Sequence, residues 1–353
     1  MAKIKKFILF GALASQGALW LDASSIQIIS SVRLSIPPAE GRFHEQFLVL
    51  PLSIMEGYQN EMIVWRGSFL QIYSPDGKAM KRLGRLGEGP GEFSIISNMS
   101  KDNAQYYFID APNRLNVFDE EFNFKKRLFL AGEKSSPIIF DMAIEDGVIA
   151  SAQRWRVTPG ISRRKDKVIS IYDKEGRWQN AFFEIKRGWK YFPDDSILGG
   201  KIMIRNKAIY FAFKSINCIW KFDLQGNFMR EKWFGKSWWR KVSYDEKEKL
   251  KSRKKGNFMK YYEQTLSSGD TIGKIYHHKN HLLLQILRDA NGFAETFIFM
   301  LDSNLAHEEG PFYLEGYQLS GVGKEYLYFV KHLGEYSPVR DFEVEVLKCR
   351  VDR

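Results

Sequence analysis

The sequence predicts an all-β fold in which small antiparallel sheets close into a ring. Three observations lead to this prediction: short runs of alternating apolar and polar residues occur along most of the chain, a strand–turn–strand unit recurs, and one crossover between units is rich in glycine. The chain has 353 residues, of which 44% are apolar and 15% aromatic. It is therefore long enough to bury a large core, and closed all-β structures of this length are often one domain.

The glycine-rich crossover covers residues 83–93, Leu-Gly-Arg-Leu-Gly-Glu-Gly-Pro-Gly-Glu-Phe, between two alternating runs. Its four glycines and one proline between Gly84 and Gly91 are incompatible with a helix or with the interior of a strand. We expect a compact loop that carries the chain from the end of one sheet to the start of the next. The loop is not a phosphate loop, because it lacks the Gly-Lys-Ser/Thr ending and leads into a strand.

Five hairpins follow one pattern, in which an apolar run ends in a polar turn and a second apolar or aromatic run follows. The side-chain oxygen at each turn can accept a backbone hydrogen bond two residues on, and a later Gly or Asn takes positive φ. Successive turns are 45 to 79 positions apart, and each unit has two further runs upstream. The turn residues are Ser74, Asp119, Asp173, Asp223 and Asp302.

Four short strands in every 45 to 54 residues are typical of the blades of a β-propeller. A β-sandwich made of hairpins is the alternative, but it requires neither a repeated crossover nor a fixed period. The last unit has runs at 326–330 and 342–347, after which the chain ends without a fourth strand. Because an open sheet edge invites aggregation, we expect the isolated run at 31–36 to complete this blade. The first blade then begins near residues 47–54, and the total is six blades.

The pattern resembles the NHL-type six-bladed β-propellers, including the exported bacterial proteins known as six-bladed β-propeller proteins. The resemblance depends on Gly84-x-x-Gly-x-Gly-Pro-Gly-x-Phe93, on residues 109–118 and on the repeated Phe/Tyr-Asp-x-x-Gly turns. It covers residues 26–350 as architecture, with motif detail in the first two blades. Blade three departs from it at 153–156 and blade four at 213–215. The resemblance implies a fold shared by ligand binders, scaffolds, lyases and lactonases, so it does not choose among them.

The N-terminus predicts a signal peptide over residues 1–23. Lys3, Lys5 and Lys6 precede an apolar run at 7–21, and Ala23 provides a small residue at the cleavage site. The alternative is a retained membrane anchor, but this run is shorter than the roughly 20 residues that a spanning helix needs. We therefore expect an exported protein, periplasmic or extracellular, with no transmembrane span after cleavage and one propeller domain over 24–353.

The formal net charge of the chain is +11, which becomes +9 once the three lysines and Asp22 of the signal peptide are removed. This balance favours anionic partners, although the export signal argues against nucleic acid. The two cysteines, Cys218 and Cys349, lie in alternating apolar runs. We expect buried free thiols, while a disulfide between them remains an alternative.

A basic insertion over about 236–265 separates the fourth and fifth sheets. Ten of the residues from 236 to 260 are Lys or Arg, and Ser243 with Glu246 forms a capping box for a helix over about 244–254. One interpretation is an anion-binding lid over one face of the ring. The other, which we favour, is a solvated helix that packs through Trp238, Trp239 and Leu250.

No metal site and no cofactor are predicted. The closely spaced His277, His278 and His281 suggest metal ligands at first, but the run 275–284 reads better as a hairpin with its turn at 279–280. The remaining histidines do not recur at one position of the blades, and no Ser/His/Asp spacing stands out.

Basic and aromatic residues do recur in the loops that join the second and third strands of each blade. These loops are expected on one face of the ring, and arginines beside Trp or Tyr suit carboxylate, phosphate or sugar-like ligands. The alternative is a solvated rim whose arginines pair with nearby acids. Lys214 and Arg288 belong to this wider set. The candidate ligand-binding residues are Arg66, Arg114, Arg154, Trp155, Arg156, Arg163, Arg164 and Arg340.

These patterns favour an exported binding or scaffolding module, expected to be monomeric, that recognises a ligand or protein partner of anionic character on its loop face. The alternative function is a hydrolase or lyase centred on the channel of the propeller, with or without a metal.

Overall fold

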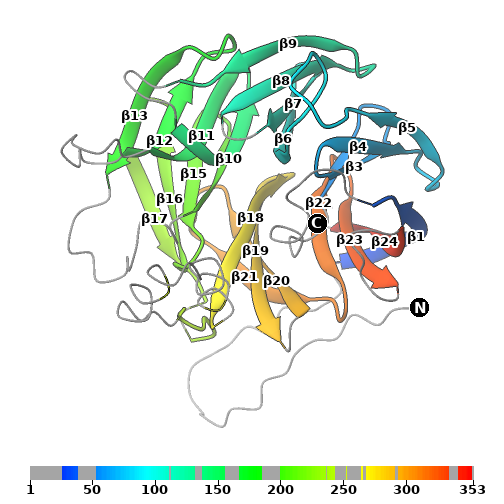
Figure 1. Ribbon diagram of the computed structural model, residues 1–353. Coiled ribbons are helices and arrows are strands. Elements are labelled where there is room, and N and C mark those ends of the chain that lie inside the picture. Colours follow the sequence, from blue (N-terminus) through cyan, green and yellow to red (C-terminus); the bar gives the residue numbers. More distant parts are fainter. Residues whose placement is uncertain are drawn as a thin grey trace.

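The structure of the protein, a computed structural model, is a six-bladed β-propeller in which each blade is a four-stranded antiparallel sheet (Figure 1). It therefore confirms the all-β ring predicted from the sequence. The structure describes residues 26–38, 53–110, 113–131, 137–155, 167–184, 199–235, 237–242, 252, 264, 268–290, 293–333 and 341–351.

In blades one to five the four strands follow the order of the chain, and the first strand of each is innermost. The first three blades consist of β2 (Ile54–Glu56), β3 (Met62–Arg66), β4 (Phe69–Tyr73) and β5 (Ala79–Leu83); β6 (Ile96–Asp102), β7 (Gln105–Asp110), β8 (Arg114–Asp119) and β9 (Phe124–Phe129); and β10 (Pro137–Glu145), β11 (Val148–Trp155), β12 (Lys167–Tyr172) and β13 (Trp178–Glu184). The last three consist of β14 (Gly200–Arg205), β15 (Ala208–Phe213), β16 (Cys218–Asp223) and β17 (Phe228–Trp233); β18 (Asp270–His278), β19 (His281–Ala290), β20 (Phe293–Asp302) and β21 (Glu308–Tyr313); and β22 (Gln318–Val322), β23 (Leu327–Leu333), β24 (Phe342–Val351) and β1 (Ile26–Ile36).

The first strands of the blades begin on one face of the ring, which we call the entry face. Because the strands are antiparallel, the loops between second and third strands lie on this face too, as do the crossovers between blades. Hydrogen bonds between neighbouring blades confirm the arrangement: the Ile96 amide donates to Gly67 of blade one, and the Ile272 amide donates to Lys214 of blade four, each at 2.7 Å.

The core is divided into six apolar clusters, one between each pair of neighbouring blades. In the cluster between blades six and one, Leu34 and Ile36 of β1 lie with Met62 and Val64 of β3. Stability therefore depends on every blade having two neighbours, which only a closed ring provides.

β1 closes the ring by pairing antiparallel with β24, as the sequence predicts. The register runs from Ile26 opposite Val351 to Ile36 opposite Phe342. Leu34 and Ile36 are buried, whereas Arg33 and Ser35 point to solvent. The first and last strands of the chain, β1 and β24, therefore lie side by side in one blade (Figure 1).

The five hairpin turns form as expected, with one correction to their chemistry. Gly77, Gly176 and Gly226 take positive φ at their turns. In blades two and five the turn residues with positive φ are instead Phe122 and Leu305, with φ of 63° and 57°. Both side chains are buried, and Phe122 stacks on Tyr106 with ring centroids 4.5 Å apart. Burial of these side chains offsets the cost of a left-handed backbone.

The turn aspartates accept backbone hydrogen bonds mostly from four residues on, rather than two. Asp119 Oδ1 accepts from the Asn123 amide at 2.7 Å, and Asp223 Oδ1 accepts from the Asn227 amide at 2.8 Å. A hydrogen bond from Lys125, together with those from Asn123, lowers the pKa of Asp119 to about 2. These carboxylates thus act as fixed turn acceptors.

The glycine-rich crossover is the compact loop expected. Leu86 and Phe93 form an isolated β-bridge, and the Phe93 amide donates to the Arg85 carbonyl at 2.9 Å. The chain folds back on itself through Phe93, so β6 begins at Ile96. Similarly, the first strand of blade one begins at Ile54, and residues 47–52 lie outside the described residues.

Both cysteines are free and buried, Cys218 in blade four and Cys349 in blade six, so the expected unpaired thiols are confirmed. Of the basic insertion, the structure describes mainly 237–242, where Trp238 and Trp239 pack against the cluster between blades four and five. The predicted helix over 244–254 falls outside the described residues except for Ser252, which is helical.

The closing strand provides the first test. Substitution Leu34→Ala removes a fully buried side chain between blades six and one, and we expect it to lower the free energy of unfolding by about 2–5 kcal/mol. The matched control is Arg33→Ala on the exposed side of the same strand, which we expect to change it by less than about 1 kcal/mol. Urea denaturation of both variants measures this, and equal stabilities would show that β1 is not part of the cooperative core.

Candidate functional site

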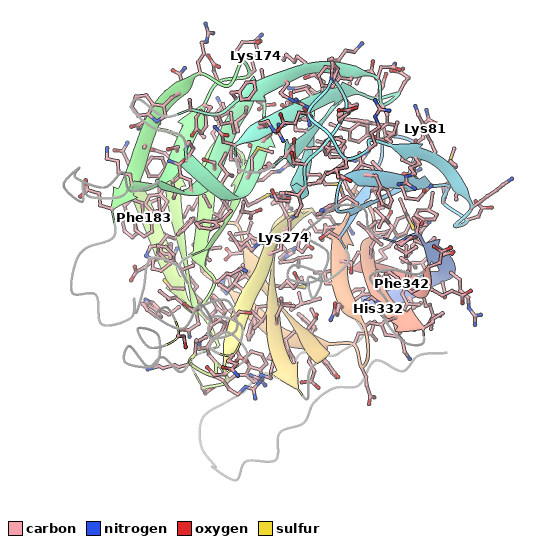
Figure 2. All side chains as sticks on the ribbon, in the orientation of Figure 1. Lys81, Lys174, Phe183, Lys274, His332 and Phe342 are labelled. Carbon is pink, nitrogen blue, oxygen red and sulfur yellow. The ribbon has the colours of Figure 1, made fainter. Side chains whose placement is uncertain are left out.

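Three inner strands direct polar side chains into one cluster at the axis of the propeller. β6, β10 and β18 each contain a β-bulge, and the residue directly after the bulge is Asn98, Asp141 and Lys274, respectively. A bulge bends its strand and re-aims the following side chain. Figure 2 shows Lys274 near the centre of the ring, whereas Lys81 and Lys174 lie at its periphery.

Lys274 spans the axis, because its ammonium in blade five donates to Asn98 Oδ1 in blade two at 3.0 Å. Asn98 Nδ2 in turn donates to Asp141 Oδ1 of blade three. The Lys274 Nζ atom also lies 5.9 Å from the ring centroid of Trp65 and 5.7 Å from that of Tyr276. Hydrogen bonding and cation–π contacts thus hold this ammonium in place.

Two further lysines, Lys201 of β14 and Lys214 after β15, come from blade four. The Lys214 backbone is fixed on both sides, since its amide donates to Gly199 at 3.0 Å and its carbonyl accepts from Ile272 at 2.7 Å. Its aliphatic stem runs close to Gly199, the residue that precedes β14. In the part of the chain that the structure describes, neither ammonium group has a hydrogen-bond or ion-pair partner.

The charges in this cluster are unbalanced. Burial, and then the neighbouring Lys201, lower the pKa of Lys214 to about 8, while Asp141 opposes the shift. Burial and Lys201 also lower the pKa of Lys274. We call Lys201, Lys214, Lys274, Asn98 and Asp141 the axial cluster. It combines three amines with one carboxylate.

Beside this cluster, an ion pair connects the basic insertion to blade five. Asp270 is fully buried, and both of its oxygens accept from Arg288, Oδ1 from Nε and Oδ2 from Nη2, each at 2.7 Å. The Arg240 amide donates to Oδ2 at 2.7 Å as well. The Arg288 guanidinium lies 3.8 Å from the ring centroid of Trp238. Arg288, which sequence reasoning placed among the rim residues, therefore anchors the start of the insertion.

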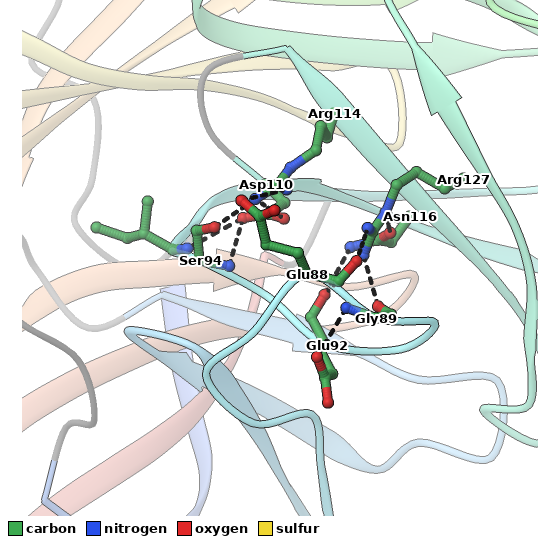
Figure 3. Close-up of polar contacts among 9 residues, drawn as sticks. Glu88, Gly89, Glu92, Ser94, Asp110, Arg114, Asn116 and Arg127 are labelled. Atoms are coloured by element: carbon green, nitrogen blue, oxygen red, sulfur yellow. Dashed lines mark hydrogen bonds and ion pairs between the residues drawn. The ribbon is translucent and has the colours of Figure 1, made fainter.

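Arg114 is the one residue among the sequence-predicted ligand-binding residues whose side chain the structure describes. It pairs with Asp110 at 2.8 Å and with Glu88 at 3.3 Å, and also contacts Ser94 (Figure 3). Asp110 Oδ1 accepts from the amides of Ser94 and Ile95 at 2.8 and 3.0 Å. Burial still raises the pKa of Asp110 against these hydrogen bonds and the charge of Arg114. Arg114, together with Asp110, thus holds the residues that lead into β6 in place.

A second arginine, Arg127 of β9, holds the glycine-rich crossover. Its guanidinium donates to the carbonyls of Glu88, Gly89 and Glu92 at 2.5 to 2.9 Å, and its Nε donates to Asn116 at 2.7 Å (Figure 3). The crossover is thereby fixed over blade two. Sequence reasoning did not single out Arg127, whose position in an ordinary alternating strand offers no signal.

The other predicted site residues lie on or near the entry face as far as they are described. Arg66, Arg154 and Trp155 end the second strands of blades one and three, but the structure describes only their backbones. The remaining four, Arg156, Arg163, Arg164 and Arg340, fall outside the described residues. Lys214 was expected on the rim, whereas nothing in the sequence linked it to Lys201 or Lys274.

The histidine run forms the hairpin expected, with His278 opposite His281 at its end. Among the described residues, no three or more His, Cys, Asp and Glu side chains are placed to hold a metal ion. Among the same residues, no helix has the length and apolar character of a membrane span.

Comparisons with known proteins support the fold. No family model and no curated protein matches the chain. Among solved structures, it is similar to a Bacteroides fragilis protein described as a "putative exported protein", with 14% identity and a TM-score of 0.55 over 94% of this chain and 97% of that one. It is also similar to a Bacteroides vulgatus member of the DUF4221 family, with 11% identity and a TM-score of 0.57 over 94% and 100%. At identities this low, the structural likeness shows a shared fold and nothing finer. The NHL type remains a prediction.

The lowered pKa of Lys214 generates a pH-dependent prediction. Below about pH 8 folding must bury this charge, so Lys214→Met should raise the free energy of unfolding by about 1–3 kcal/mol at neutral pH. In the unfolded chain this lysine stays protonated up to its ordinary pKa of about 10.5, whereas in the folded protein it loses its proton near pH 8. The free energy of unfolding of the wild type therefore rises relative to that of the variant as pH increases from about 8 to about 10.5. Urea denaturation across this range measures the difference, and a pH-independent difference would contradict the shift.

The Asp270 ion pair generates a second prediction. Asp270→Asn leaves Arg288 without its carboxylate in a buried setting, so we expect a loss of about 3–5 kcal/mol in the free energy of unfolding. Asp146→Asn, at an exposed turn where Asn tolerates positive φ equally well, is the control and should change stability by less than about 0.5 kcal/mol. Equal losses in thermal or chemical denaturation would show that the ion pair is not structural.

Proposed function

We propose that this protein is an exported binding or scaffolding module that recognises an anionic ligand or an acidic protein partner on the entry face of its propeller. The observation that carries the proposal is the axial cluster, which contains three amines and only one carboxylate. A rigid ring that presents positive charge at its centre suits recognition of negative charge.

The residues around the cluster also support recognition of negative charge on the entry face. The second strands of blades one and three end on the entry face with Arg66 and Arg154, and the basic insertion starts beside blade five. Export, through cleavage of residues 1–23, agrees with the description of one structural neighbour. A monomer without a cofactor remains our expectation. A hydrolase or lyase centred on the axis, with or without a metal, remains the alternative prediction.

Binding to an acidic polymer tests the proposal. We expect the full chain to be retained on immobilised polyglutamate at low salt and released as the Debye length falls from about 10 Å at 0.1 M to about 3 Å at 1 M. The double variant Arg154→Glu and Arg156→Glu should elute at clearly lower salt with an unchanged melting temperature.

The control reverses two lysines at the periphery of the ring, Lys81→Glu and Lys174→Glu, both exposed (Figure 2). This variant has the same change in net charge but keeps Arg154 and Arg156, so it should elute close to wild type. If both double variants shift equally, retention reflects overall charge and the entry face is not a specific surface. Retention that persists at high salt would also count against the proposal.

A further inference from the structure

The axial cluster contains more hydrogen-bond donors than the protein uses. An ammonium group has three N–H bonds and no acceptor. Lys274 has a single hydrogen bond, to Asn98, and among the described residues Lys201 and Lys214 have none from Nζ. All three side chains are partly buried, and their Nζ atoms are not among the fully buried polar atoms without a partner. The cluster is therefore a set of positioned donors that remain open to an acceptor from outside the protein.

The nearby carboxylate does not supply that acceptor. Asp141 Oδ1 accepts from Asn98 Nδ2, and Oδ2 accepts from the Ile202 backbone amide at 3.0 Å. Both oxygens therefore bind amide N–H groups, and Asp141 forms no ion pair among the described residues. Asn98 must turn its oxygen to Lys274 and its nitrogen to Asp141, because the reverse orientation would place acceptor against acceptor. Asp141 orders the cluster without neutralising it.

The charge of the cluster indicates the charge of a ligand that would match it. When all three amines are protonated, they and one carboxylate leave two positive charges, which match a dianion. Lysines bind phosphate-type groups as point charges, and three of them can surround a compact tetrahedral oxyanion. The three come from blades four and five, where pairing of β14 with β15 and of β18 with β19 fixes their positions.

We propose that Lys201, Lys214 and Lys274 form a binding site for a small dianionic oxyanion, either free or as the terminal group of a larger ligand. The inference rests on the proposed function, because it names the chemistry that the entry face recognises. Lys274 supplies the donor fixed across the axis by Asn98. Lys201 and Lys214 supply the donors from the neighbouring blade.

A bound dianion changes the proton balance of the site. Negative charge beside an ammonium raises its pKa, and Lys214 starts from a pKa of about 8. Binding above neutral pH therefore takes up protons, and affinity must fall as pH rises through that value. Sulfate is the informative probe, since its own charge does not change in this range.

Isothermal titration calorimetry of the full chain with inorganic phosphate, sulfate, glycerol phosphate and acetate tests the site. We expect one oxyanion per chain for the first three, acetate at least about tenfold weaker, and sulfate affinity falling from about pH 7 to about pH 9. We expect sulfate binding to weaken by about tenfold or more in each of the variants Lys201→Met, Lys214→Met and Lys274→Met. Lys174→Met, an exposed lysine of the periphery, should leave it unchanged.

Glycerol phosphate separates the two forms of the ligand: tighter binding than inorganic phosphate supports a terminal group, and weaker binding supports a free ion. Absence of saturable binding, or sulfate affinity that all three axial variants leave unchanged although each variant still folds cooperatively, overturns the site. If sulfate binds but polyglutamate does not, the axial site stands, and the proposed recognition of an acidic protein partner fails. If polyglutamate is retained and sulfate is not bound, the entry face stands and the axial site is overturned.

Discussion

The pairing of β1 with β24 is the interaction on which the rest of the structure depends. Each blade buries its apolar faces against two neighbours, and blade six can meet blade one only when its outer strand is in place. The axial cluster inherits this dependence, since the hydrogen bond between Lys274 and Asn98 joins blade five to blade two. A ring that opened at blade six would lose the fixed distance between them. Closure by the N-terminal strand thus controls both stability and the geometry of the site.

The axial cluster is costly to fold. Burying three amines near one another lowers the pKa of two of them, which means that the charged forms are destabilised in the folded state. The contacts of Lys274 with Asn98, Trp65 and Tyr276 offset part of the penalty. Lys201 and Lys214 have no such compensation among the described residues. Perturbed ionisable groups of this kind concentrate at functional sites.

Arginines outside the cluster serve mainly to hold loops in place. Arg127 donates to three carbonyls of the glycine-rich crossover, Arg114 pairs with Asp110, and Arg288 binds Asp270 at the start of the insertion. A planar guanidinium suits this work because it satisfies several acceptors at once. The division is consistent: arginines brace the entry face, while lysines, as compact point charges, carry the free positive charge at the axis.

The sequence by itself determined the fold, because the signals for it are local. Alternating runs specify strands, and Asp119, Asp173 and Asp223 specify turns through nearby backbone amides. The recurrence of the four-strand unit specifies blades. The isolated run at 31–36 even predicted closure, since an unfinished last blade requires a partner.

Only the tertiary structure decided which charged residues form a site. Lys274 and Asn98 are 176 residues apart, and no period relates them. Their meeting depends on bulges in β6 and β18, which alternation of side chains cannot reveal because one extra residue re-aims all that follow. For Arg114 the sequence left ligand binding and pairing with a nearby acid both open, and in the structure its guanidinium pairs with Asp110, directly opposite it across β7 and β8, and contacts Ser94.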